Sequence, residues 1–61
     1  MVVGDIVKFK FKYEPNINVY IRAGDLGIVK SKALWYLEIM HLKSGTTLLL
    51  KTSEIDILEV Q

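Results

Sequence analysis

The chain has 61 residues, of which 51% are hydrophobic and 25% are charged, and it contains one proline and no cysteine. From this length we expect a single domain over residues 1–61 and no multi-domain organisation, and the lack of cysteine in these residues excludes disulfides, thiolate nucleophiles and cysteine-bound zinc among them. The net charge of +1 is far below the basic balance of a dedicated nucleic-acid-binding protein. No apolar run approaches the roughly 18 residues of a membrane span, and the first residues lack a signal-peptide pattern, so we expect a cytoplasmic protein.

The first predicted strand follows the turn signal Gly4-Asp5 and continues to residue 13. From residue 7 onward, apolar side chains alternate with lysines, which is typical of a strand buried on one face. A proline and two asparagines then interrupt the pattern and predict a loop over residues 14–18. The apolar residues 19–22 either fold back over the mouth of a barrel or form a short strand of their own.

The middle of the chain predicts the most regular structure. A turn cluster at residues 23–27 leads into a predicted strand over residues 27–32. Residues 35–42 are rich in aromatic and branched side chains and predict a central strand. Residues 43–46, with a glycine that can adopt a positive φ, predict a hairpin turn, and residues 47–51 predict the returning strand.

Residues 52–55 predict a single helical turn, and residues 56–60 predict a short closing strand. No segment has a helical period over ten residues. Five short strands separated by turns predict an all-β fold, a small five-stranded barrel, because closure removes exposed sheet edges. The side chains expected in the core are Val7, Phe9, Phe11, Ile28, Trp35, Leu37, Ile39, Leu48, Leu50, Ile55 and Leu58.

Three segments resemble SH3-like β-barrels, especially those with a KOW-type motif: Gly4-Asp5-Ile6-Val7, then Gly24, Gly27 and Val29 at matching spacing, and Ser53-Glu54-Ile55 near the end. The resemblance spans nearly the whole chain. It implies that a single-turn 3₁₀ helix precedes the last strand, and that the protein is similar to small stand-alone bacterial or phage accessory proteins. The first loop departs from ribosomal and transcription-factor members, whose loop tends to be short, basic and glycine-rich.

Catalytic signals in the sequence are weak. His41 is the only histidine, and a nucleophile–base pair would need Ser31, Ser44 or Ser53 to be brought close to it by the fold. We expect His41 to be an ordinary strand residue, and Glu54 and Asp56 to belong to a solvated rim. No loop has calcium-ligand spacing. The sequence therefore predicts no enzyme, no cofactor, no metal site and no small-molecule substrate.

A nucleic-acid interface is one alternative function. Lys8, Lys10 and Lys12 would lie on one face of the first strand at intervals of about 6.8 Å, near the spacing of phosphates along a strand. Lys30 and Lys32 would widen this patch if their strand were adjacent. Stacking rings would come from Tyr13, Tyr20 or Tyr36. The competing interpretation is a solubilising face that protects the sheet against aggregation.

A protein interface is the function that we expect first. Leu49 must point away from Leu48 and Leu50, and strand alternation likewise places Tyr36, Met40 and Leu42 opposite to the neighbouring apolar residues. The predicted protein-interaction residues are therefore Tyr36, Met40, Leu42 and Leu49. Their partner would be another protein or a second copy of the chain, and a homodimer is expected. The other explanation is that the loop with Ile17, Val19 and Ile21 covers this surface.

A third interpretation is an aromatic groove for peptides or modified side chains, built from Tyr13, Tyr20, Trp35 and Tyr36. In a chain this short, the same four rings can equally be ordinary core and rim residues.

Overall fold

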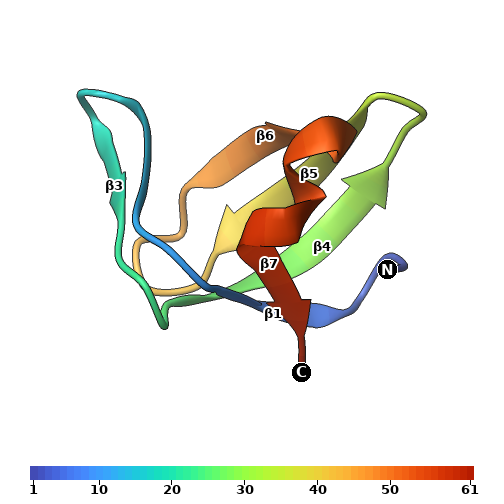
Figure 1. Ribbon diagram of the computed structural model, residues 1–61, viewed down its shortest axis with the longest axis horizontal. Coiled ribbons are helices and arrows are strands. Elements are labelled where there is room, and N and C mark those ends of the chain that lie inside the picture. The colour runs from blue at the N-terminus through green and yellow to red at the C-terminus, as the bar shows by residue number, and fades with distance from the viewer.

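The computed structural model describes all residues from 1 to 61 and contains seven strands and one 3₁₀ helix. The elements in chain order are β1 (Ile6–Phe9), β2 (Tyr13–Asn16), β3 (Val19–Ile21), β4 (Leu26–Lys32), β5 (Tyr36–His41), β6 (Thr47–Lys51), η1 (Thr52–Ile57) and β7 (Leu58–Val60). The all-β prediction is confirmed. Figure 1 shows the β3 arm standing apart from the larger sheet, with η1 leading from β6 into β7.

The strands form two antiparallel sheets. The larger sheet has five strands in the order β6-β5-β4-β1-β7, and β2 and β3 form a separate two-stranded ribbon. The two outer strands of the larger sheet, β6 and β7, are not hydrogen-bonded to each other, so this sheet does not close into the expected five-stranded barrel. The predicted 3₁₀ turn before the last strand is present, but it is longer than expected and delays β7 to Leu58.

The first strand is shorter than predicted. It ends at Phe9, and the chain bends through residues 10–12, so Phe11 is 61% exposed instead of buried. β4 begins at Leu26 and β7 at Leu58, and the last backbone bond to the C-terminal segment runs from the Lys10 N–H to the carbonyl of Ile57, before the chain turns away. The chain then pairs with β3, where Tyr13 lies opposite Ile21.

The predicted loop at residues 14–18 is mostly a strand. Tyr13–Asn16 is β2, and the tight turn that follows is fastened by the Asn18 backbone N–H, which donates to the side-chain oxygen of Asn16 at 2.9 Å. Of the two structures expected for residues 19–22, the short strand is the one that forms. Its last residue, Ile21, is completely buried in the core, although it was not among the predicted core residues.

The core lies on the inner face of the five-stranded sheet and beneath Ile21. Seven of the expected core residues are buried, and their shared feature is that they alternate along strands whose register keeps them on one face. They are Val7, Phe9, Leu37, Ile39, Leu48, Leu50 and Leu58. Ile55 is only half-buried but packs against this cluster.

Two further core predictions are wrong. Ile28 pairs with Met40 and Ile6 on the face turned away from the core, and its neighbour Val29 is buried instead. Trp35 precedes β5 and is 70% exposed, because the strand begins one residue later, at Tyr36.

Gly27 allows the strands to approach closely at the centre of the sheet. It pairs with Val7 on one side and His41 on the other. A β-carbon added there would lie 2.8 Å from Cγ2 of Ile39 and 3.1 Å from the backbone oxygen of Met40. This position therefore requires glycine for its lack of a side chain rather than for a positive φ.

Candidate functional site

An apolar patch lies on the face of the five-stranded sheet that is turned away from the core, and it is interrupted by Lys8 opposite Leu26 and by Glu38 opposite Leu49. The cross-strand pairs Ile6–Ile28 and Ile28–Met40 place one row of apolar side chains across β1, β4 and β5. Leu49 is diagonal to Met40 across the β5–β6 pairing, and Leu42 follows β5 opposite Leu26. We call this surface the outer face; its members are Ile6, Leu26, Ile28, Tyr36, Met40, Leu42 and Leu49.

All four predicted protein-interaction residues belong to the outer face. Tyr36, Leu42 and Leu49 are exposed, and Met40 is half-buried between its neighbours. The loop proposed to cover them packs elsewhere, since Ile21 is in the core and Ile17 is fully exposed. Ile6, Leu26 and Ile28 are the members that the sequence prediction missed, because only the β1–β4 register shows that they share this face.

An open groove adjoins the outer face at the first residue of β5. It has a volume of about 630 Å³ and is lined by Trp35, Tyr36, Lys51, Thr52 and Ser53. Tyr36 and Lys51 are a cross-strand pair, which makes Tyr36 part of both surfaces. We call this hollow the aromatic groove.

Two hydrogen bonds of Thr52, one from its backbone and one from its side chain, hold the aromatic groove together and leave its rings free. The Thr52 N–H donates to the carbonyl of Trp35 at 2.9 Å, and the Thr52 hydroxyl donates to the carbonyl of Leu34 at 3.4 Å. These bonds hold the β4–β5 loop against the start of η1. Trp35 and Tyr36 keep 70% and 44% of their surface exposed, so their rings are available to a ligand.

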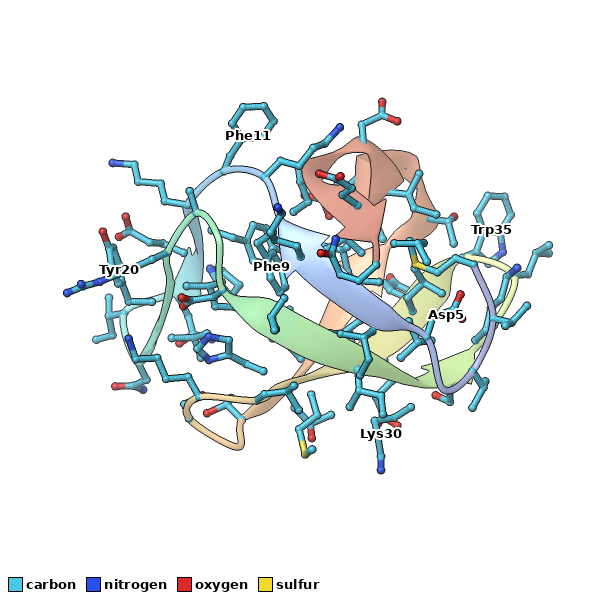
Figure 2. All side chains as sticks on the ribbon, turned by 90° about the horizontal axis from the view of Figure 1, so that it is seen from below. Asp5, Phe9, Phe11, Tyr20, Lys30 and Trp35 are labelled. Carbon is cyan, nitrogen blue, oxygen red and sulfur yellow. The ribbon has the colours of Figure 1, made fainter.

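The four aromatic residues proposed for a groove do not gather. Tyr13 stacks on Phe9 at 6.3 Å between ring centroids, and the Arg22 guanidinium lies 5.9 Å from the ring centre of Tyr20. Figure 2 shows Tyr20 and Trp35 at opposite ends of the molecule. Only Trp35 and Tyr36 line one hollow together. Burial, and secondly the charge of Glu54, raise the pKa of Tyr13 above its usual range.

A second, polar hollow of about 330 Å³ lies beyond the last residue of β5. His41 is 3% exposed, and both ring nitrogens are hydrogen-bonded: Nε2 lies 2.8 Å from Oδ2 of Asp25, and Nδ1 lies 2.7 Å from Oγ of Ser44. Tyr20, Arg22 and Lys43 complete the lining. The fold has thus brought one of the three candidate serines to His41.

Asp25 is held in its ionised form. Its Oδ2 accepts a hydrogen bond from the Arg22 backbone N–H at 3.1 Å and contacts His41. These two bonds, in that order, lower the pKa of Asp25 below its ordinary value. The other candidate serines lie elsewhere, since Ser31 donates to Oε1 of Glu38 at 3.3 Å and Ser53 lines the aromatic groove.

The five lysines of the predicted nucleic-acid patch do not form one surface. Lys8 lies on β1, while Lys10 and Lys12 lie in the bend that follows it. Lys30 and Lys32 are on the neighbouring strand, but the Ile6–Ile28 register places them at its far end. Figure 2 shows Lys30 projecting from the side opposite to Phe11, and Lys10 and Lys12 flank Phe11 in the sequence. Lys32 also donates to the carbonyl of Met1 at 3.0 Å.

The rim carboxylates also occupy separate environments. Glu54 is half-buried within η1, where its charge acts on Tyr13, and Asp56 is exposed. No group of three or more His, Cys, Asp or Glu side chains is placed to hold a metal ion. The single helix, η1, has only six residues, and no helix here could cross a membrane.

Comparisons of the chain with protein-family models, with curated proteins and with solved structures find no match. Functional inference therefore depends on the two hollows, the outer face and the distribution of charge.

Proposed function

We propose that this protein is a small non-enzymatic interaction module with an SH3-like architecture, which binds an extended segment of another protein at the aromatic groove and the adjoining outer face. The strand order β6-β5-β4-β1-β7 and the 3₁₀ helix before the last strand support the SH3-like assignment. Because one small fold supports many functions, the functional part of the proposal depends on the surface itself.

The observation that carries the proposal is the surplus of large apolar side chains at the surface. Twelve are exposed, whereas the core cluster contains nine residues. Trp35 and Tyr36 are adjacent among the exposed ones and line one groove. Tryptophan and tyrosine are the residues that most often dominate binding energy at protein interfaces, because they bury a large area with few rotatable bonds.

The groove also indicates the chemistry of its partner. Lys51 is the only charged residue among its five lining residues, and it stands directly across from Tyr36. An extended peptide with an apolar or aromatic side chain would pack on Trp35, and an adjacent carboxylate would pair with Lys51. Thr52 and Ser53 add hydroxyl groups for hydrogen bonds at the rim.

Selection from a random peptide library on the immobilised full chain tests this proposal. We expect enriched peptides to combine aromatic or aliphatic residues with Asp or Glu, and to change the fluorescence of Trp35, the only tryptophan in the chain. Trp35→Ala should weaken binding by tenfold or more, a loss of about 1.4 kcal/mol or more, as is typical of a dominant contact. Tyr20→Ala, an exposed ring outside the groove, is the matched control and should leave affinity unchanged.

Two results would contradict the proposal. One is the absence of any enriched peptide, and the other is equal affinity in the Trp35→Ala variant. Sedimentation equilibrium distinguishes a second copy of the chain as the occupant: a dimer that dissociates in the Met40→Lys or Leu49→Lys variant would assign the outer face to self-association instead.

A second candidate function is single-stranded nucleic-acid binding, and one observation favours it. Phe11 is exposed between the exposed Lys10 and Lys12 in the sequence, and Lys12 and the exposed Arg22 each adjoin a member of the Tyr13–Ile21 pair. A ring flanked by cations is the usual means of stacking a base while neutralising the backbone. Only part of the predicted lysine set contributes to this arrangement, and Lys8 lies next to it on β1.

Charge reversal separates this candidate from a solubilising role of the lysines. Lys10→Glu with Lys12→Glu should abolish binding to a fluorescent oligothymidylate, whereas the matched pair Lys30→Glu with Lys32→Glu should retain most of it. The wild-type affinity should fall steeply with salt. Equal losses in both double variants, or no binding at low salt, would eliminate this candidate.

A further inference from the structure

Ser44, His41 and Asp25 form a continuous chain of hydrogen bonds in the polar hollow, at the opposite end of β5 from the aromatic groove. Oγ of Ser44 lies 2.7 Å from Nδ1 of His41, and Nε2 of His41 lies 2.8 Å from Oδ2 of Asp25. A serine, an imidazole and a carboxylate in this order are the parts of an activated nucleophile, although the two ring nitrogens exchange their usual roles.

The hydrogen-bond partners of His41 determine which ring nitrogen carries a proton and in which direction the Ser44 hydroxyl donates. The ionised carboxylate of Asp25 can only accept, so Nε2 of His41 carries the proton and Nδ1 presents its lone pair. The hydroxyl of Ser44 therefore donates to Nδ1. The Thr46 backbone N–H donates to the same hydroxyl oxygen at 3.2 Å, which leaves that oxygen one lone pair for a bond to carbon.

The surroundings of Ser44 favour an anionic reactant. Arg22 and Lys43 line the hollow, and the only carboxylate in the lining, Asp25, is engaged by His41 and by the backbone of Arg22. The backbone N–H groups of Lys43 and Ser44 donate to no group within the chain. Free N–H groups beside a nucleophile can stabilise the oxyanion that forms when it attacks a carbonyl.

We propose that Ser44 is a nucleophilic acceptor site that takes up the acyl group of a small acyl phosphate. A bond forms between Oγ of Ser44 and the carbonyl carbon, and the bond from that carbon to the phosphate oxygen breaks. The serine proton passes to Nδ1 of His41 and then to the departing phosphate. Arg22 and Lys43 bind the phosphate, and the product is an O-acyl serine plus inorganic phosphate.

The three side chains have different tasks in this step. Ser44 and His41 touch the reacting atoms, as nucleophile and general base. Asp25 is a positioning residue, because it fixes the ring and its tautomer through Nε2. The reaction is a single modification of the chain and requires no turnover, so it is compatible with a binding module.

Incubation of the full chain with acetyl phosphate, followed by peptide mapping by mass spectrometry, tests the proposal. The other two serines, Ser31 and Ser53, are internal controls in the same molecule. We expect Ser44 to acetylate about 100-fold faster than either, the lower bound for a positioned general base. Equal labelling of the three serines, or acetylation confined to amino groups, would overturn the proposal without any variant being needed.

Variants then test each role. Ser44→Ala should lose the labelled peptide, and His41→Gln should reduce labelling of Ser44 to the level of Ser53. Arg22→Gln and Lys43→Gln should slow the reaction with acetyl phosphate more than that with p-nitrophenyl acetate, whose leaving group lacks phosphate. Equal slowing with both reagents would remove the assigned role of the two cations and leave the acyl phosphate without a recognition element.

The role of Asp25 has a spectroscopic test. The ¹⁵N shifts of His41 should report a proton on Nε2 in the wild type and a mixture of tautomers in Asp25→Asn, together with slower labelling of Ser44. Slower labelling with an unchanged tautomer would overturn the positioning role.

Discussion

At one end of β5, Tyr36 lies beside Trp35 in an open aromatic groove; at the other end, His41 is buried and hydrogen-bonded through both ring nitrogens. The groove is maintained by two hydrogen bonds of Thr52, one from its backbone and one from its hydroxyl group, and its two rings take no part in them. The polar hollow is maintained by the side chains themselves, because His41 connects the turn before β4 to the β5–β6 hairpin. Changes in the groove should therefore alter binding, and changes in the polar hollow should first alter stability.

The largest expected effect is that of His41→Ala. This change removes both hydrogen bonds, leaves Asp25 and Ser44 without their partner and opens a cavity beside Phe9, whose ring makes an edge contact with the imidazole. We expect the free energy of unfolding to fall by about 2–4 kcal/mol, measured by urea titration. A loss below about 0.5 kcal/mol would show that the polar hollow does not support the fold.

Gly27→Ala tests the same region through the backbone, with a somewhat smaller effect. The added methyl group collides with Cγ2 of Ile39, which is completely buried and cannot move aside freely. We expect a loss of about 1–3 kcal/mol in the free energy of unfolding.

A second substitution identifies that collision as the cause. Because leucine lacks the β-branched methyl group, Gly27→Ala combined with Ile39→Leu should cost less than the sum of the two single changes. Additive losses would place the strain elsewhere.

We next expect acid to lower the free energy of unfolding through the carboxylate of Asp25. In the folded chain the pKa of Asp25 is below its ordinary value, so ionisation of this carboxylate favours folding. This contribution is fully present above about pH 4 and is lost as the pH falls through the folded-state pKa. The stability difference between wild type and Asp25→Asn should therefore be constant near neutrality and shrink in acid. A difference that is independent of pH would contradict this account.

The smallest stability effect should come from Trp35→Ala. Its side chain is mostly exposed and the loop bonds use only its backbone, so we expect a change within about 0.5 kcal/mol in urea titration. A large loss would mean that Trp35 is a structural residue, and the comparison between the two ends of β5 would fail.

Alternation along the strands was sufficient to predict most of the core. Leu37 and Ile39, and likewise Leu48 and Leu50, alternate within uninterrupted strands, and all four are buried as expected. Alternation failed for Phe11 because β1 ends at Phe9 and the chain bends at residues 10–11, and for Ile28 because its face is set by pairing with Met40. Where β1 ends and which residue pairs with Ile28 both depend on segments far away in the sequence, so the residues themselves carry no signal for either.

The candidate sites likewise combine residues that alternation predicts with contacts that depend on long-range pairing. Four of the seven outer-face residues could be predicted from alternation, because neighbouring apolar residues in a strand, such as Leu48 and Leu49, cannot both point inward. The pairing of Asp25 with His41 joins residues sixteen positions apart and depends on how the turn before β4 meets the hairpin. The short spacing of His41 and Ser44 around a turn was the one sequence signal that could have indicated their contact.

The most direct test of the proposed function is a ¹H–¹⁵N NMR titration of the full chain with a library-selected peptide. We expect shifts concentrated at Trp35, Tyr36 and residues 51–53, with little change at Asp25, His41 and Ser44. Shifts centred on the polar hollow or on residues 10–12 would contradict it.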